Sequence, residues 1–298
     1  MKNILIIGCG LLGSSLLRRI QKKKIANKIF IYEKSNSNLT KIKKLKLPGK
    51  IVKKLEDGVK KSDLIILCTP MSEYKNLILK MNKFLSTKTI ITDVGSSKLE
   101  SSKIIKKHLR KDVSWTQSHP ITGSEVSGPE HGKHDIFEKK WCVLIKEKNT
   151  KKNHLTILNN FWKKIGSKVV IMTPEKHDKI FSITSHLPHL IAYNLVKSAQ
   201  DFEKIQNFDL IKYSAGGLRD FSRIAASNEI MWRDIFFNNK QNISKAIDLF
   251  IKNLNSFKKD INSKNNKSIL YKLIQTKKVR SKIIKLKQDV SKPDFGRS

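Results

Sequence analysis

The chain has 298 residues, 39% of them hydrophobic, with 13 Gly and 7 Pro, which excludes collagen-like, low-complexity and wholly disordered classes. Its 61 Lys and Arg against 25 Asp and Glu give a formal charge of +36, which is typical of proteins that bind nucleic acids or anionic membranes. However, 53 of the 61 are Lys spread along nearly every segment, which indicates a chain-wide bias instead of a binding patch, and we expect no specific nucleic-acid partner.

In the first 175 residues, short β-branched runs alternate with amphipathic, Lys-rich stretches, which predicts βαβ units and a parallel sheet. The predicted strands are Asn3–Ile7, Lys28–Tyr32, Leu64–Cys68, Thr89–Thr92, Val113–Gln117, Trp141–Ile145 and Lys168–Met172. The predicted helices include Leu12–Lys23, Tyr74–Phe84, Leu99–Leu109 and Asn153–Ile165.

After Pro174 the strand-like runs stop and long helical patterns follow. These predicted helices are His177–Gln200, Phe208–Ala226, Glu229–Asn238, Lys240–Ser263 and Lys267–Lys287, with Val290–Ser298 as an extended tail. We therefore expect an α/β domain over residues 1–175 and an all-α domain over residues 176–298.

A glycine-rich turn follows the first predicted strand directly, and its residues are Gly8, Cys9, Gly10, Leu11, Leu12 and Gly13. In this GxGxxG pattern Gly8 permits a tight turn, Gly10 lets the backbone approach a pyrophosphate, and Gly13 lets the helix pack on the strand. The free N–H groups at the start of the following helix would face the phosphates. The pattern predicts a Rossmann-type dinucleotide site, although alone it is also compatible with a plain strand–helix turn.

The acid that accompanies this pattern is Glu33, which ends the second predicted strand twenty residues after Gly13. A carboxylate there bonds the ribose 2′-hydroxyl of NAD and repels a 2′-phosphate, so we expect NAD in preference to NADP, although the adjacent Lys34 weakens that expectation. Thr69 and Pro70 end a later strand at the same carboxyl edge and are further candidates for cofactor binding.

Three other segments are candidates for the chemistry. Residues 93–98 (DVGSSK) leave a strand at the carboxyl edge and contain Ser96, although Ser or Asp there could simply cap the next helix. His119 opens a loop that two prolines and two glycines make rigid. Ser185, His186 and His189 surround Pro188 within a helical pattern, where proline costs about 3 kcal/mol unless it is accommodated.

Arginine is rare here, yet three of the eight lie at Arg219, Arg223 and Arg233. The guanidinium fork suits carboxylates, so these residues suggest a dianionic substrate. The alternative is that Arg219 and Arg233 form salt bridges with Asp220, Asp234 or Glu229.

Three widely spaced cysteines, Cys9, Cys68 and Cys142, offer neither a disulfide framework nor a CxxC metal site. No carboxylate or third histidine is spaced to complete a metal site around His186 and His189, so we expect no metal. The longest apolar run, Ile4–Leu17, is interrupted by glycines and is shorter than the ~20 residues that span a bilayer. We expect a cytoplasmic protein without a membrane partner.

Five segments, in their order and spacing, resemble those of prephenate dehydrogenases of tyrosine biosynthesis and of the related arogenate and cyclohexadienyl dehydrogenases: GCGLLGSS, DVGSSK, HPITGSEVSGPEHG, SHLPHLIA and GGLRDFSRIAASNEIMWRDIF. The resemblance extends to about Phe257, and the tail Asp289–Arg297 resembles the C-terminus of the cyclohexadienyl form. It implies a Rossmann domain followed by a helical domain that forms a homodimer. The implied reaction is oxidative decarboxylation of prephenate with NAD to 4-hydroxyphenylpyruvate, CO2 and NADH, with arogenate, which gives tyrosine, as an additional substrate.

The resemblance also implies roles for single residues. His119 would accept the proton of the substrate's 4-hydroxyl group as hydride leaves C4 for the nicotinamide, and Ser96 would bond that hydroxyl, although the neighbouring Ser97 stands where many relatives carry Val. Arg223 would hold a substrate carboxylate, and His189, as a hydrogen-bond donor to a carbonyl, would favour prephenate over arogenate. The other positions implied to lie near the substrate are Ser185, Ser124, Trp232 and the Gly216-Gly217 turn. Trp232, Gly216 and Gly217 could come from the partner subunit. Glu125, Asp220 and His186 would organise the site.

Two alternatives stay open at this point. β-Hydroxyacid dehydrogenases and imine reductases share the architecture but rely on a catalytic Lys in the helical domain and lack the HPxxGxE pattern. A basic nucleic-acid-binding protein would show clustered basic residues with interleaved aromatics, whereas aromatics are only 7% here.

Overall fold

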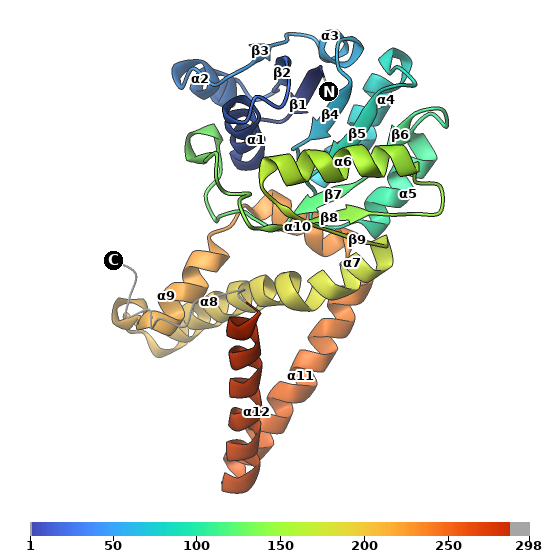
Figure 1. The fold of residues 1–298 in the computed structure, drawn as a ribbon. Helices are drawn as coiled ribbons and strands as arrows, with labels where there is room; N and C mark the ends of the chain where they lie inside the picture. Colours follow the sequence, from blue (N-terminus) through green and yellow to red (C-terminus); the bar gives the residue numbers. More distant parts are fainter. Residues whose placement is uncertain (1, 287–298) are drawn as a thin grey trace.

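A computed structural model describes residues 2–286 of the chain (Figure 1), and the predicted extended tail lies outside these residues. Its first part is a six-stranded sheet in the order β3-β2-β1-β4-β5-β6, with every neighbouring pair parallel. The strands are β1 (Asn3–Ile7), β2 (Lys28–Tyr32), β3 (Lys50–Ile51), β4 (Leu64–Leu67), β5 (Ile90–Asp93) and β6 (Ser114–Trp115). The parallel sheet is confirmed, and only the two-residue β3, too short to give an apolar pattern, was not predicted.

The order of the strands reverses between β1 and β4, so a crevice for a ligand is expected at the carboxyl ends of these two strands. The helices that connect the sheet are α1 (Leu11–Lys22), α2 (Asn36–Lys44), α3 (Leu55–Lys60), α4 (Tyr74–Met81) and α5 (Leu99–His108), with 3-10 turns η1 (Met71–Glu73) and η2 (Asn82–Phe84). Helix α2, which was not predicted, begins where the Ser35 hydroxyl accepts the N–H of Asn38.

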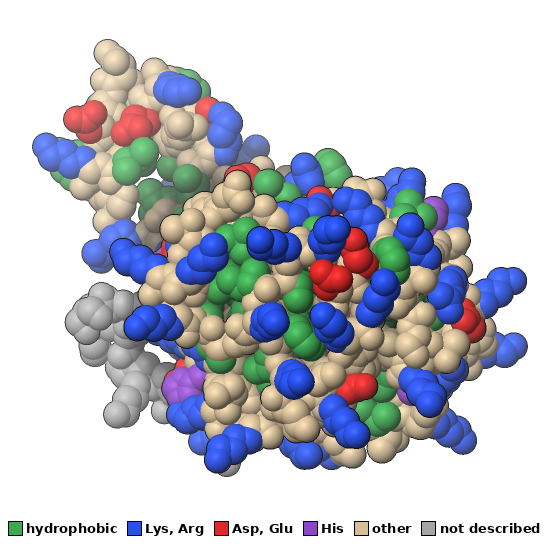
Figure 2. All heavy atoms as spheres, turned by 90° about the horizontal axis from the view of Figure 1, so that it is seen from above, with side chains coloured by type: hydrophobic (Ala, Val, Ile, Leu, Met, Phe, Trp, Pro, Cys, Tyr) green, Lys and Arg blue, Asp and Glu red, His purple; other side chains and the backbone are tan. Residues whose placement is uncertain are grey.

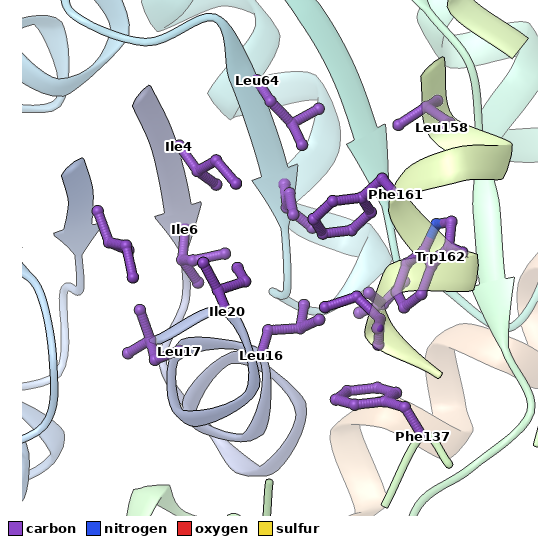
Figure 3. Packing of buried hydrophobic residues seen from close by; sticks show 14 of the residues in the cluster. Ile4, Ile6, Leu16, Leu17, Ile20, Leu64, Phe137, Leu158, Phe161 and Trp162 are labelled. Atoms are coloured by element: carbon purple, nitrogen blue, oxygen red, sulfur yellow. The ribbon is translucent and has the colours of Figure 1, made fainter. Parts of the chain in front are cut away.

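The core of this domain lies on both faces of the sheet because alternate side chains of β1 point to opposite sides. Ile4 and Ile6 join one cluster and Leu5 and Ile7 the other. Figure 3 shows the first cluster, in which Ile4 and Ile6 meet side chains from α1 and from the later helix α6 (Lys152–Ile165). The fully buried Trp162 of α6 packs there, so the first 22 residues and a helix more than 130 residues later share one core.

A second, three-stranded sheet stands beside the first, in the order β7-β8-β9. It consists of β7 (Ser118–Pro120), β8 (Trp141–Ile145), antiparallel to β7, and β9 (Lys168–Met172), parallel to β8, with η3 (Pro129–His131) between β7 and β8. The predicted strand Val113–Gln117 therefore ends early: Thr116 still bonds Ile91 of the first sheet, whereas the carbonyl of Gln117 already accepts the N–H of Ile145. This switch of sheets sets His119 on the short strand β7.

The rest of the described chain is helical, as predicted. Its elements are α7 (Pro174–Phe181), a π-helical turn η4 (Ser182–His186), α8 (Leu187–Gln206), η5 (Ile211–Tyr213), α9 (Gly216–Ala225), α10 (Glu229–Asn238), α11 (Lys240–Asn262) and α12 (Asn266–Lys285). Pro188 is accommodated because it lies at the start of α8, directly after the π turn, where its missing N–H has least effect.

The single helix predicted over Phe208–Ala226 is wrong. Asn207 adopts the left-handed conformation (φ 54°) and ends α8, and the chain then makes only the turn η5 before α9 begins at Gly216. Gly216 and Gly217 are consequently the first residues of a helix, and the predicted turn at this position is wrong as well.

Helices α11 and α12 form a pair that extends away from the α/β part, while α8 and α9 lie side by side (Figure 1). Among the described residues no helix is long and apolar enough to cross a membrane. Figure 2 shows Lys and Arg side chains scattered over the visible face with few acids between them, and this dispersal agrees with a compositional bias.

Candidate active site

The glycine-rich turn has the shape that a pyrophosphate requires. Gly8 has φ +86°, and a Cβ on Gly13 would lie 2.1 Å from the carbonyl oxygen of Gly8, so neither position tolerates a side chain. A Cβ on Gly10 would meet nothing within 4 Å, and no side chain caps the start of α1 at Gly10. Leu11 and Leu12 form the first turn of α1. The open face and the free N–H groups fit a dinucleotide phosphate.

Glu33 lies beside this turn, at the end of β2. One oxygen of its carboxylate accepts the backbone N–H of Cys9 at 2.7 Å and the other accepts that of Ser35 at 2.9 Å. The Cys9 thiol is buried, and burial, together with the charge of Glu33, raises its pKa to about 12. Thr69 and Pro70 follow β4 at the same edge. The predicted cofactor residues thus come together at the crevice between β1 and β4.

His119 is bonded to a chain of buried groups that sequence reasoning missed. Its Nδ1 lies 2.8 Å from Nε2 of His177, and Nδ1 of His177 lies 2.8 Å from Oδ1 of Asp178. His177 and Asp178 are fully buried, and burial lowers the pKa of both His119 and His177 well below the usual value. The adjacent His-Asp pair at the start of a predicted helix was the only available signal.

These contacts fix the tautomers of both rings. Because a carboxylate only accepts, Nδ1 of His177 is a donor and its Nε2 is an acceptor. Nδ1 of His119 must then carry the hydrogen, and Nε2 of His119 is left with a free lone pair. The network therefore prepares His119 as a neutral base at Nε2.

Asp178 also holds the helix that follows DVGSSK. Its carboxylate accepts the backbone N–H groups of Lys98 at 2.8 Å and Leu99 at 2.9 Å, which are the first donors of α5. The expectation that a Ser or Asp of the DVGSSK segment caps this helix is wrong, because α5 has no side-chain cap from its own segment and receives one from α7. One carboxylate thus joins the DVGSSK loop to the histidine pair.

Lys98 is fully buried, which is exceptional for a lysine. Its Nζ lies 2.6 Å from Oδ2 of Asp93 and 2.7 Å from the carbonyl oxygen of Ser118, next to His119. Asp93 also accepts the hydroxyl of Tyr74 at 2.9 Å. The positive charge of Lys98 adds to burial in lowering the pKa of His119.

The two serines of DVGSSK have different surroundings. Ser97 is fully buried and its hydroxyl faces Asp178 at 3.4 Å, so it belongs to the structural network. Ser96 is half-buried, and its backbone faces the buried ring of His186. Ser96 is consequently the serine whose hydroxyl is available to a ligand.

His189 lies on α8 with its ring stacked on Trp232 of α10, at 3.8 Å between ring centroids. Its Nδ1 donates to the carbonyl oxygen of Ser185 at 2.9 Å, and burial lowers its pKa. A neutral ring with its hydrogen on Nδ1 has only an acceptor at Nε2. The donor role expected of His189 toward a substrate carbonyl stays a prediction, and it requires the ring to donate from Nε2. The Trp232 ring thus reaches His189 within one subunit.

Arg223 of α9 reaches back to the loop after His119. Its Nη1 lies 3.2 Å from Oε2 of Glu125, and Glu125 also accepts the hydroxyl of Ser124 at 3.0 Å. The Arg223 side chain is 40% exposed. Arg219 and Asp220 lie on the same helix but are exposed and do not take part in this contact. Arg233 pairs with Asp234 at 2.8 Å, which is one of the salt bridges that the alternative interpretation predicted.

Unsatisfied polar atoms mark the site. In the described part of the chain, six buried side-chain N or O atoms have no hydrogen-bond partner, and four of them belong to residues already named as candidates. These four are Thr69 Oγ1, His186 Nε2, Arg223 Nε and Trp232 Nε1. Such an atom costs about 1–3 kcal/mol when nothing pairs with it. Because the Ser96 backbone faces the ring of His186, the other three atoms are the candidates for contact with a ligand. Among residues 2–286 no group of three or more His, Cys, Asp or Glu is arranged to hold a metal ion.

Comparison with known proteins identifies the family of this chain. The chain matches the family model for the prephenate dehydrogenase nucleotide-binding domain over residues 16–171 and that for the prephenate dehydrogenase dimerization domain over residues 173–276. It is 31% identical to a cyclohexadienyl dehydrogenase of Zymomonas mobilis over 94% of this chain and 95% of the relative. It is 29% identical to a prephenate dehydrogenase of Bacillus subtilis over 98% of this chain and 78% of the relative.

Among solved structures, the fold is similar to that of prephenate dehydrogenase from Aquifex aeolicus in complex with hydroxyphenyl propionate and NAD+. The TM-score is 0.88 and the identity is 33%, covering 95% of this chain and 98% of the Aquifex chain. Both halves of the chain match, in order, the two domain models of one family. Glu33, Ser96 and His119 lie in the first matched range and His189 and Arg223 in the second, whereas the glycine turn precedes residue 16. The chain belongs to the prephenate dehydrogenase family.

Proposed function

We propose that the chain catalyses the NAD-dependent oxidative decarboxylation of prephenate, and that it accepts arogenate as well. The observation that carries this proposal is the neutral Nε2 of His119, held by His177 and Asp178 beside the DVGSSK loop. The relatives support it, since they are named as prephenate and cyclohexadienyl dehydrogenases.

The residues present fit NAD, as the glycine turn and Glu33 indicate. When bound, NAD supplies the acceptor for the hydride that leaves C4 of the substrate ring. Nε2 of His119 takes the proton of the 4-hydroxyl group, while Ser96 orients that hydroxyl. As the proton arrives, Nδ1–H of His119 polarises toward His177 and Asp178, whose carboxylate stabilises the developing positive charge. Loss of the ring carboxylate as CO2 then makes the ring aromatic.

The rest of the substrate is held by the helical half. Arg223 binds a carboxylate with its guanidinium, in place of the contact to Glu125. The acceptor at Nε2 of His189 suits the ammonium group on the arogenate side chain, and this geometry supports arogenate as a second substrate. Prephenate carries a keto group at that position, which needs a donor from elsewhere in the site.

The β-hydroxyacid alternative is not favoured by the structure. That class relies on a catalytic lysine in the helical domain, but within residues 174–286 every lysine is exposed except the half-buried Lys272, which pairs with Asp260. Among residues 2–286 the buried lysine is Lys98, which belongs to the α/β half and is paired with Asp93.

We further propose a cytoplasmic homodimer with an α/β domain of residues 1–175 and a helical domain of residues 176–298. Large hydrophobic side chains are exposed on the helical half, for example Phe202, Phe208, Phe237 and Tyr271, and an interface between two copies would cover them. The match to a dimerization domain model over residues 173–276 supports this assignment.

The experiment that tests the function is NADH formation by the purified chain with prephenate and arogenate offered separately, each with NAD and with NADP. We expect turnover of both substrates with NAD. A folded chain that binds NAD but turns over neither substrate would contradict the proposal.

A further inference from the structure

The surroundings of Glu33 pose an electrostatic problem. NADP differs from NAD by one additional phosphate on the ribose 2′-oxygen, and a chain of formal charge +36 attracts the more negative cofactor. Two lysines follow Glu33 closely along the chain. Lys34 follows it directly, and Lys41 is one turn along α2 from Asn38, whose Nδ2 lies 3.4 Å from the Glu33 carboxylate. With free amines, both positions would suit a 2′-phosphate.

Lys34 is engaged by an acid from another element. Its Nζ lies 2.7 Å from Oε2 of Glu73, which is in η1 just after the carboxyl end of β4. The hydrogen bond that Lys34 donates to Glu73 raises the pKa of Lys34, so the amine stays charged but has a partner. Glu73 thus brings a second carboxylate to the residue that follows Glu33.

Lys41 is engaged in the same way by the loop that follows His119. Its Nζ lies 2.5 Å from Oε1 of Glu130, in η3. The Glu130 carboxylate packs against the backbone of Gly128. Gly128 has φ +107°, and a Cβ there would lie 2.5 Å from Oε2 of Glu130. Any larger residue at 128 would push this carboxylate away. η3 packs against both α1 and α2, so the loop is fixed over the cofactor end.

Acids are scarce in this chain, 25 against 61 bases, so most lysines of the described residues have no acidic partner. Lys34 and Lys41 are therefore unusual in being paired. We infer that Glu73 and Glu130 make the cofactor site selective for NAD over NADP, by occupying Lys34 and Lys41 and by adding two carboxylates around Glu33. The inference rests on the cofactor assignment of the proposed function. It assigns specificity to residues outside the GxGxxG turn and its acid.

The size of the effect follows from exposure. The four side chains are between 33% and 50% exposed, and such pairs shift an equilibrium by a factor of about 1.5 to 5. A 2′-phosphate can compete for each lysine, so each glutamate contributes a moderate factor and the two factors multiply, because the pairs share no group.

The test is calorimetric titration of the full chain with NAD and with NADP, without prephenate or arogenate, so that its outcome does not depend on the proposed reaction. The variants are Glu73→Gln, Glu130→Gln and the double variant. Asp112→Asn is the matched control, because Asp112 forms an equivalent exposed pair with Arg110 at 2.6 Å, at the amino edge of the sheet. A further variant adds Lys34→Gln to Glu73→Gln.

We expect each single variant to lower the Kd for NADP about 1.5- to fivefold and the double variant about two- to twenty-fivefold, while the Kd for NAD changes less than about 1.5-fold. Lys34→Gln should abolish the gain of Glu73→Gln, and added salt should reduce every gain. An unchanged NADP affinity in the double variant, an equal change for NAD, or the same gain in Asp112→Asn would overturn the inference. If the wild-type chain binds neither dinucleotide, the inference fails together with the cofactor assignment, whereas a gain in NADP affinity without turnover contradicts only the proposed reaction.

Discussion

The cofactor end and the catalytic end of the site are both built from pairs of a basic and an acidic side chain, but the pairs differ in burial. At the cofactor end, Lys34–Glu73 and Lys41–Glu130 are between 33% and 50% exposed, and water screens them. At the catalytic end, Lys98–Asp93 and His177–Asp178 have no exposed side-chain surface at all. Exposed pairs can be lost at little cost, whereas removal of one buried partner leaves an uncompensated charge. The pairs of the cofactor end can therefore adjust the preference for NAD over NADP. Those of the catalytic end determine whether the site forms and reacts.

The largest effect is expected at His119. Replacement His119→Asn removes the base at Nε2, and kcat should fall by about 10²- to 10⁴-fold, the usual contribution of a general base. NAD binding should stay within twofold of wild type, about the error of a titration, because His119 is not part of the glycine turn. Steady-state kinetics and NAD titration of the same preparation check both statements. A near-normal kcat would remove His119 from the mechanism.

Replacement of Lys98 tests the comparison directly through stability. Lys98→Met leaves Asp93 buried without its charged partner and should lower the free energy of unfolding by about 3–5 kcal/mol. Lys34→Met breaks an exposed pair and should change it by less than about 1 kcal/mol. Urea denaturation of both variants measures the difference. Equal losses would show that burial does not separate the two ends.

Arg223 and Glu125 form a pair that is nearly as exposed as those of the cofactor end, at 40% and 28%, but its guanidinium is the group proposed to hold the substrate. Arg223→Ala should raise KM for the substrate about ten- to a hundredfold with a smaller change in kcat, since a hydrogen bond to a charged group is worth about 1.5–3 kcal/mol. Glu125→Gln should leave KM equal or lower, because the carboxylate competes with the substrate for Arg223. An increase of KM in Glu125→Gln matching that of Arg223→Ala would show that the pair acts only as a structural contact.

Acid should destabilise the catalytic end through its buried histidines. Burial lowers the pKa of His119, His177 and His186, the last to about 4. Below about pH 6.5 the unfolded chain binds protons at these positions that the folded chain excludes, so stability is lost as pH falls. Each histidine contributes a slope of about 1.4 kcal/mol per pH unit. His186→Gln should reduce the slope of unfolding free energy between about pH 6 and 5 by one such step, and an unchanged slope would contradict its buried, neutral state.

The two ends also differ in how far sequence predicts them. The glycine turn and Glu33 are separated by a single βα unit, and the parallel strands that carry them bring them together by a general rule. The catalytic network joins Lys98, His119 and Asp178, which come from α5, β7 and α7 and meet only because the second sheet and the helical half close over the first sheet. The pattern of hydrophobic residues in the sequence predicts neither the capping of α5 by Asp178 nor the contact between the two histidines.

The failures within single elements have local causes. The helix predicted over Phe208–Ala226 has enough apolar periodicity, but Asn207 in the left-handed conformation ends the preceding helix and Gly216 begins the next one. The strand Val113–Gln117 is split because its last residue pairs with a different sheet. In both cases the predicted kind of element is present, but tertiary hydrogen bonding or backbone conformation changes where it begins or ends.

The smallest effect is expected at His189, where one hydrogen bond separates two substrates. Nδ1 of His189 is used by Ser185, so a neutral ring offers an acceptor that the arogenate ammonium can use and the prephenate keto group cannot. His189→Ala should therefore lower kcat/KM for arogenate about two- to tenfold more than for prephenate. His189→Gln retains an acceptor and should restore part of the arogenate activity. If prephenate turnover falls more than arogenate turnover, His189 acts as a donor, and the ring must then be protonated or turn away from Ser185 when the substrate binds.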